Sequence, residues 1–345
     1  MFSFLKKLFI PNHSEPDQAA PAPADATQPE KSTDTDAAEP KPAASEPAEP
    51  KPAEPDTATP PAPAPAPVTA EISMAAELSL KICLQSDVGL VRTNNEDRGF
   101  YKSPPDGDVA EQKGTLVVVA DGMGGASAGE VAADLAVRLI PEAYYASTTE
   151  PGLALKQSLE AASSAIYRQA QEDLTLRGMG TTCVALAIRR SEAFMAYVGD
   201  SRLYLLRDGQ FYQLTDDHSV VNEMVRQGLL TREQARNHEE RNVLSLSMGG
   251  RPEISASGWD EPMSLREGDR FLLCSDGLHD LVSDERMRLI VAEFPPEEAT
   301  LRLIEAAKQG GGHDNITAAI VHVSKAGVES AVEPRGTREF KLTTQ

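Results

Sequence analysis

Apolar and polar positions follow two periods along the chain, one typical of strands and one typical of helices. Residues 78–86 alternate apolar and polar side chains, which predicts a strand with one buried face. Residues 116–125 read LVVVADGMGG, an apolar run typical of a fully buried strand that leads into an acidic residue and glycines. Further strands are predicted at residues 178–190, 193–209, 210–215, 269–274 and 316–324.

Helical spacing occurs in pairs of segments. Residues 127–146 and 153–174 place apolar side chains at helical intervals, and two more helices are predicted near residues 283–293 and 296–309. Residues 216–250 indicate two short helices and an irregular segment that crosses the surface. Strands in two antiparallel sets with paired helices predict an α+β fold. We expect a four-layer α/β/β/α sandwich, in which helix pairs flank two central antiparallel sheets.

The composition changes sharply towards both ends of the chain. Residues 11–77 are rich in Pro, Ala and Glu, which predicts a disordered linker, and residues 325–345 are polar and predict a flexible tail. The folded domain is therefore expected at residues 78–324. Residues 1–10, MFSFLKKLFI, form a short amphipathic segment suited to an anionic membrane surface or a partner protein. An unstructured start with some hydrophobicity explains this segment equally well.

Charge and cysteine content exclude several classes of protein. The 345 residues carry a formal net charge of −20, which argues against nucleic acid as a partner because that partner requires a basic face. Cys83, Cys183 and Cys274 lie far apart inside apolar runs, as expected for buried thiols in a reducing compartment. No stretch approaches the ~20 apolar residues of a membrane-spanning helix. We expect a cytoplasmic protein, with residues 1–10 as its candidate for peripheral membrane contact.

Acidic residues recur beside glycine at the ends of apolar runs. Asp121 follows the run 116–120, Asp276 follows that of RFLLCSDG, and Asp314 lies in the turn GGHDNIT. Carboxylates that converge without soft ligands repel one another unless a hard dication such as Mg²⁺ or Mn²⁺ neutralises them. The simpler alternative is that they are ordinary turn residues on separate parts of the surface.

Four further positions carry polar groups of interest. Glu96 and Asp97 add two carboxylates, and Arg92 stands four residues before Glu96. An arginine in a polar loop is either solvated or presents its planar guanidinium to a phosphate. Asp200, in GDSR, interrupts a strand pattern and either faces a cleft or belongs to a plain turn.

Six sequence blocks occur here in a fixed order: RTNNED, VVVADGMGGASAGE, GMGTT, VGDSRLYLLRDG, LLCSDGL and GGHDNIT. They resemble the signature blocks of bacterial PPM-type (protein phosphatase 2C-like), metal-dependent serine/threonine phosphatases, over about residues 78–324. The resemblance implies hydrolysis of phosphoserine and phosphothreonine in proteins by a water that two metal ions activate, without a phospho-enzyme. It also implies Mn²⁺ or Mg²⁺ as cofactor, two ions and in some members three.

The resemblance assigns ligand roles at matching positions. Asp121 would bridge the two ions, with the Gly122 carbonyl on one of them. Asp276 and Asp314 would complete the other ion's ligands. Glu96 would hold the second ion directly or through water.

The remaining roles carry over in the same way. Asp97 would support the Glu96 ligand, and Asp200 with Asp276 would hold a third, weaker ion. Arg92 would bind the substrate phosphate, so Arg92 and Asp121 are the expected catalytic residues. The segment after Asp217 would form a flap that selects substrates. Met123 replaces the histidine of the eukaryotic DGHGG block, and a thioether cannot protonate a leaving group.

The expected partners are phosphorylated proteins, in particular serine/threonine kinases and their substrates, and the chain is expected to act as a monomer. One alternative is a PPM-like pseudophosphatase or regulatory scaffold tethered through its N-terminal segment. The other is a tethered adaptor whose main activity resides in that N-terminal segment.

Overall fold

The computed structural model describes residues 67–73, 78–105, 107–124, 128–325 and 338–341. The chain divides into two units, Met1–Pro63 and Ala64–Gln345, and every described residue belongs to the second. The expected segment 1–10 and most of the expected linker 11–77 lie outside the described residues. Within the described ranges, no helix combines the length and the apolar character needed to cross a bilayer.

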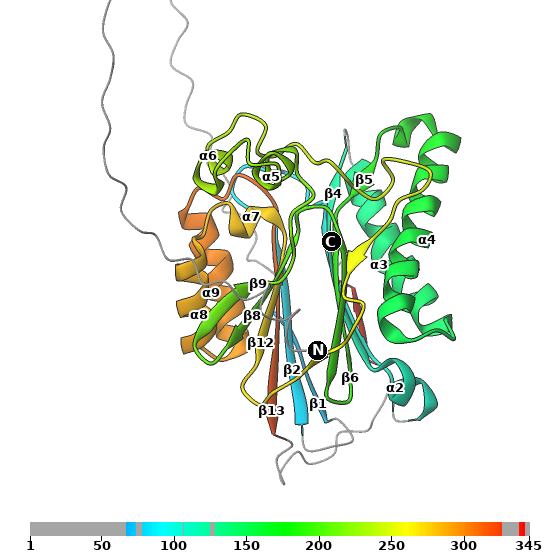
Figure 1. Cartoon of the computed structure of the whole chain (residues 1–345), viewed down its shortest axis with the longest axis vertical. Coiled ribbons are helices and arrows are strands. Elements are labelled where there is room, and N and C mark those ends of the chain that lie inside the picture. Colours follow the sequence, from blue (N-terminus) through cyan, green and yellow to red (C-terminus); the bar gives the residue numbers. More distant parts are fainter. Residues whose placement is uncertain (1–66, 74–77, 106, 125–127, 326–337, 342–345) are drawn as a thin grey trace, which may run out of the picture. The chain divides into compact units, whose positions relative to one another are not determined.

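Two antiparallel sheets form the centre of this unit (Figure 1). The first sheet has six strands, in the spatial order β1 (Val68–Ser73), β2 (Leu78–Asp87), β13 (Ile316–Lys325), β12 (Arg270–Cys274), β8 (Arg202–Arg207) and β9 (Gln210–Gln213). The second sheet runs β10 (Ser257–Gly258), β7 (Glu192–Val198), β6 (Cys183–Arg189), β4 (Thr115–Met123), β3 (Asp97–Ser103) and β14 (Arg338–Lys341). Two short strands lie beside this path, β11 (Met263–Ser264) on β7 and β5 (Gly180–Thr181) on β4.

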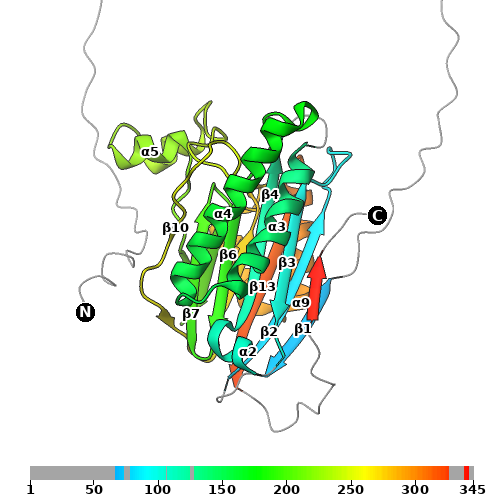
Figure 2. The same ribbon diagram turned by 90° about the vertical axis from the view of Figure 1, so that its right-hand side faces the viewer.

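Helix pairs cover the outer faces of both sheets, as Figures 1 and 2 show. The long helices α3 (Ala128–Ala146) and α4 (Pro151–Glu172) cover the second sheet, and α8 (Asp284–Glu293) and α9 (Pro296–Gln309) cover the first. Shorter helices are α2 (Asp108–Lys113), η1 (Leu174–Leu176), α5 (Val220–Arg226), α6 (Arg232–Arg236) and α7 (Asp276–His279). The expected four-layer α/β/β/α sandwich is confirmed.

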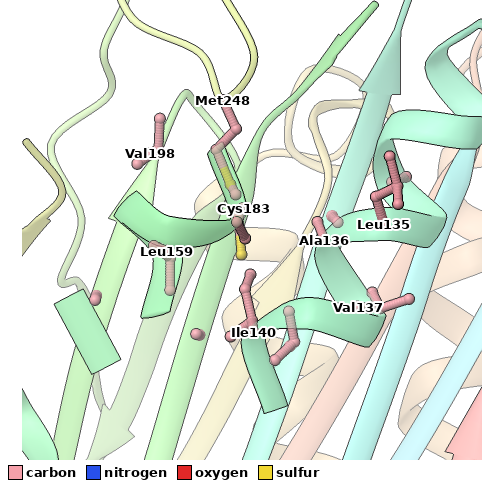
Figure 3. Close-up of a cluster of buried hydrophobic side chains, with 14 of the residues drawn as sticks. Leu135, Ala136, Val137, Ile140, Leu159, Cys183, Val198 and Met248 are labelled. Atoms are coloured by element: carbon pink, nitrogen blue, oxygen red, sulfur yellow. The ribbon is translucent and has the colours of Figure 1, made fainter. Parts of the chain in front are cut away.

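Three apolar layers hold the four structural layers together. Figure 3 shows the layer under α3 and α4, where Ile140 and Leu159 meet Cys183 and Val198 of the sheet. A second layer fills the space between the sheets, and a third packs α8 and α9 onto the first sheet. All three cysteines are buried free thiols, as predicted. Burial of both faces explains why the strands read as apolar runs in the sequence.

Most predicted elements appear within a few residues of their expected ends, and the hairpin between β8 and β9 is confirmed. Its two-residue turn places Asp208 at φ 53° and Gly209 at φ 76°, the left-handed conformation that tight hairpins require. The described fold also includes β1 and β14, which lie outside the expected range 78–324. Strand β3 and helix α2 were not predicted, because the sequence around them is rich in charges and turn formers.

Candidate metal centre

The acidic residues singled out in the sequence come from both sheets. Asp97, the first residue of β3, pairs in register with Asp121 of β4. Asp200 lies in the turn by which the chain passes from β7 in one sheet to β8 in the other. Asp276 begins α7 directly after β12, and Asp314 lies in the turn that leads into β13.

These carboxylates lie close enough to perturb one another. Burial raises the pKa of Asp121 well above its ordinary value, and the nearby charges of Asp276, Asp97, Asp200 and Asp314 raise it further. Burial also raises the pKa of Asp276, which shares a hydrogen bond with Asp121. The same cause raises the pKa of Asp97 and that of Asp200 to about 7 each. The structure therefore brings these five acids into one cluster rather than spreading them over the surface.

Arg92 stands at the exposed side of this cluster. Its Nη2 donates to Oδ2 of Asp314 at 2.9 Å, and half of its side chain (52%) remains exposed. This hydrogen bond raises the pKa of Arg92, as do the charges of Asp314, Glu96 and Asp121. Burial raises the pKa of Glu96, whose backbone carbonyl accepts a hydrogen bond from the Gly122 N–H at 3.2 Å. The guanidinium can thus reach an anion at the edge of the carboxylate cluster.

Asn315 holds the loops of the site together and was not recognised from the sequence. Its Oδ1 accepts from the backbone N–H of Glu96 at 2.8 Å, and its Nδ2 donates to the carbonyls of Val88 (3.0 Å) and Asn94 (2.9 Å). Its own N–H donates to Oδ1 of Asp314 at 2.8 Å. The sequence signal was its place directly after the turn aspartate, where short polar side chains bind nearby backbone.

Two glycines allow the acid-bearing segments to approach closely. At Gly277, the second residue of α7, a Cβ would lie 2.0 Å from the carbonyl oxygen of Asn315 and 3.5 Å from Cβ of Asp314. At Gly122 a Cβ would lie 2.2 Å from the carbonyl oxygen of Gly129 in α3. Any larger residue would force these segments apart, which explains glycine directly after Asp276 and after Asp121.

Asp97 and its neighbour Arg98 are fixed from opposite sides. Ser275 Oγ, on the other sheet, donates to Asp97 Oδ2 at 2.7 Å. Arg98 is almost fully buried and pairs with Glu130 (2.6 Å) and Asp134 (2.7 Å) of α3. It also donates to the carbonyls of Asn95 and Asp97. Sequence reasoning missed Arg98, because its burial depends on carboxylates that lie more than thirty positions further along the chain.

A histidine also lies in the cluster, although it is not His313, which stands beside Asp314 in the sequence. His313 is exposed. His279, three residues after Asp276 on α7, is buried, and its Nε2 lies 3.1 Å from the carbonyl oxygen of Asp200. The sequence signal was its i, i+3 spacing from Asp276 on a helix.

The segment after Asp217 is attached beside Asp200. His218 N–H donates to the carbonyl of Gly199 at 3.0 Å, and Gly199 N–H donates back to His218 Nδ1 at 3.1 Å. Asp217 pairs with Arg202 at 2.7 Å. The short helices α5 and α6 follow at the same end of the sheets as α7 (Figure 1).

The donor set suits hard dications. It consists of carboxylate oxygens, which Mg²⁺ and Mn²⁺ prefer, and their mutual repulsion is relieved by positive charge. Within the described ranges, no group of three or more His, Cys, Asp or Glu side chains is arranged so that it could hold a metal ion. Mg²⁺-type sites commonly retain several waters and use one or two protein carboxylates, so three protein ligands on one ion are not required.

Comparison with known proteins gives consistent matches. The protein phosphatase 2C family model matches residues 93–305. The serine/threonine protein phosphatase PstP of Mycobacterium tuberculosis is 39% identical over 254 residues, which cover 71% of this chain and 45% of PstP. Protein phosphatase PhpP of Streptococcus pneumoniae is 35% identical over 255 residues, covering 72% of this chain and 100% of PhpP.

A solved structure agrees with these matches. It is that of the catalytic domain of the serine/threonine protein phosphatase PstP in complex with two manganese ions, with a TM-score of 0.61 and 36% identity over 72% of this chain and 99% of that one. This chain spans less than half the length of full PstP. The family model and the two relatives agree with each other, and the chain belongs to the protein phosphatase 2C family.

Proposed function

We propose that this protein is a metal-dependent protein phosphatase that hydrolyses phosphoserine and phosphothreonine. The observation that carries the proposal is the cluster of five aspartates drawn from both sheets, with the guanidinium of Arg92 exposed at its edge. The names of the relatives PstP and PhpP support the same reaction. The cofactor is Mn²⁺ or Mg²⁺, in line with the two manganese ions of the PstP structure.

The proposed ligands follow the positions within the cluster. Asp121 and the Gly122 carbonyl, with Asp276, Asp314 and Glu96, would hold two ions, and Asp97 would support them from its site beneath Asp121. Asp200 and Asp276 would hold a third, weaker ion. Bound ions would lower the pKa of a water molecule and offset the negative charge of a phosphoryl group.

The protein's own residues contribute orientation and charge. Arg92 presents planar N–H donors suited to two oxygens of a phosphate, and this interaction stabilises the charge of the transferring group. Asn315 and Gly277 fix the loops that carry Glu96, Asp276 and Asp314, so the acids need little reorganisation during the reaction. Met123, the last residue of β4, has no proton to donate. Leaving-group protonation therefore falls to water or to another residue.

The other parts of the chain have proposed roles in placement. The phosphatase domain comprises residues 78–324 together with strands β1 and β14. The rest of residues 11–77 acts as a linker, the rest of residues 325–345 forms a tail, and residues 1–10 contact a partner or a membrane surface. The physiological substrates are proposed to be proteins phosphorylated by serine/threonine kinases, and the kinases themselves. The presence of all the acids in one cluster gives no support to a pseudophosphatase.

The decisive experiment replaces Asp276 by Asn. We expect this variant to lose nearly all Mn²⁺-dependent hydrolysis of p-nitrophenyl phosphate and of a phosphothreonine peptide. The matched control is Asp208→Asn in the exposed β8–β9 turn, where Asn also tolerates the positive φ. Retention of most activity by Asp276→Asn in chelator-treated buffer would refute the proposed mechanism.

Deleting residues 1–66 tests the tethered adaptor. The deletion leaves Val68 and the rest of β1 paired with β2, so catalysis on a small substrate should survive while cellular placement changes. Loss of peptide hydrolysis by the deleted protein, with its fold intact, would instead assign activity to the N-terminal segment.

A further inference from the structure

We propose that His279 is a positioning residue for the weaker metal site, because its imidazole connects the helix that carries Asp276 to the turn that carries Asp200. The inference rests on the proposed function in one respect, the assignment of a third ion to these two aspartates. It concerns a residue of this chain that no sequence block singled out.

The hydrogen bond has one direction. His279 Nε2 lies 3.1 Å from the backbone carbonyl oxygen of Asp200, and a carbonyl oxygen only accepts. Nε2 therefore carries the proton and donates it. The other ring nitrogen, Nδ1, lies 3.2 Å from Oδ1 of Asp280, and this contact lowers the pKa of the Asp280 carboxyl. Since the side chain is only 3% exposed, water does not compete effectively for the Nε2–H donor.

This hydrogen bond reaches a turn that lies between the two sheets. Asp200 lies where the chain leaves the second sheet at β7 and enters the first at β8, so its turn belongs to neither ladder. The preceding Gly199 has φ 100°, a conformation that glycine adopts readily. The turn is held from one side by His218 through Gly199 and from the other by His279.

The two carboxylates that His279 brings together repel each other. Asp276 is the main charge that raises the pKa of Asp200, after burial itself. His279 and Asp276 lie three residues apart on α7, so they project from neighbouring positions on the same helix. The Nε2–H bond thus sets the spacing between Asp276 and Asp200 and opposes the movement that their repulsion favours. An ion that binds both carboxylates would then find them already placed.

The experiment measures Mn²⁺ binding directly, by isothermal titration and by electron paramagnetic resonance of free Mn²⁺, on the full chain. His279→Gln places an amide N–H near the position of Nε2, whereas His279→Asn is too short to reach the Asp200 carbonyl. The pair differs by one methylene and keeps the polarity of the buried site. His322→Gln, on β13, is the matched control away from the cluster.

We expect His279→Asn to bind the weakest ion about tenfold less tightly, the value of one lost hydrogen bond, and to keep the affinity and number of the tighter ions. His279→Gln should bind that ion almost as the unaltered protein does, and His322→Gln should not differ from it. Circular dichroism and thermal unfolding verify that the variants fold. If His279→Asn does not fold, the binding curve of folded His279→Gln decides: normal weak-ion affinity supports the proposal and its loss overturns it.

Three other results would overturn the inference. Equal weak-ion affinity in the Asn variant and the unaltered protein would show that the bond does not position Asp200. Loss of the tighter ions together with the weak one would show a general structural role. Binding of only two ions by the unaltered protein would remove the third site while leaving the proposed two-ion hydrolysis intact. Failure of the proposed function itself would show separately, as activity retained by Asp276→Asn.

Discussion

Protein stripped of divalent ions should become less stable as the pH rises from 5 to 8, and Asp97 is one of the buried acids that cause this loss. Its side chain is 2% exposed, and burial raises its pKa from 3.8 to about 7. Hydrogen bonds from Thr317 and Ser275 lower this pKa, and the charges of Asp276 and Asp314 raise it. Between pH 3.8 and about 7 the folded protein therefore holds a proton on Asp97 that the unfolded chain has already released.

The sign and the magnitude follow from proton linkage. Between pH 3.8 and about 7 the folded state binds more protons at Asp97 than the unfolded state does, so the free energy of unfolding falls as the pH rises. One pKa unit corresponds to about 1.4 kcal/mol. The range from pH 5 to the folded pKa of about 7 spans about two pH units. Ionisation of Asp97 should therefore lower the free energy of unfolding by about 3 kcal/mol between pH 5 and pH 8.

The assay is urea unfolding in the presence of a chelator at pH 5, 6, 7 and 8, with Asp97→Asn as the comparison. His218 and His322 act in the opposite direction, because burial lowers the pKa of each and stability is then lost as the pH falls below 6.5. They are the same in both proteins, so the difference between the two pH profiles reports Asp97 together with the effect of its charge on the pKa of Asp121. Parallel profiles would refute the reasoning, and saturating Mn²⁺ should restore stability at pH 8.

Three further substitutions test the scaffold and the phosphate site. Arg98→Met should lower the free energy of unfolding by about 3 kcal/mol, because it leaves buried carbonyls without donors; a loss below about 1 kcal/mol in denaturant titration would contradict this. Gly89→Ala should reduce Mn²⁺ affinity and activity together, since its φ is 83° and a Cβ would lie 2.2 Å from the carbonyl oxygen of Asp314; unchanged metal titration would count against it. Arg92→Ala should lower kcat/KM for a phosphopeptide roughly 100-fold. The control is Arg302→Ala, which removes a surface ion pair on α9 and should leave kcat/KM unchanged. Similar losses in both variants would exclude phosphate binding by Arg92.

Much of the fold could be predicted because its strands are buried on both faces and its helices are amphipathic. The apolar run before Asp121 and the helical spacing that leads to Ile140 each indicate a buried face. Such a face packs against a whole layer of side chains rather than against one partner residue. The acids could be recognised for a related reason. A carboxylate beside glycine after an apolar run is also typical of an ordinary turn, and the signal is that the pattern at Asp121 recurs at Asp276.

Strand β3 could not be predicted, because its first residues are charged. The buried Asp97 accepts a hydrogen bond from Ser275, which follows β12 of the other sheet, and the buried Arg98 pairs with two carboxylates of α3. Such contacts join segments far apart in sequence, and no local period records them. The passage of the chain from one sheet to the other at Asp200 could not be predicted for a similar reason. In the sequence, residues 193–209 look like one strand interrupted by a turn.

The residues that sequence reasoning missed share one physical property: they bind backbone groups of the loops that carry the acids. Asn315 binds the N–H of Glu96, Arg98 binds the carbonyl of Asp97, and His279 binds the carbonyl of Asp200. Hydrogen bonds to the main chain fix each loop without consuming the carboxylate oxygens that a cation needs. Because the loops are held in this way, burial and then repulsion among the acids raise the pKa values of Asp121 and Asp200, and the repulsion does not separate the acids. The carboxylates that are held close together therefore favour the binding of positive charge. A dication-dependent phosphatase uses this property.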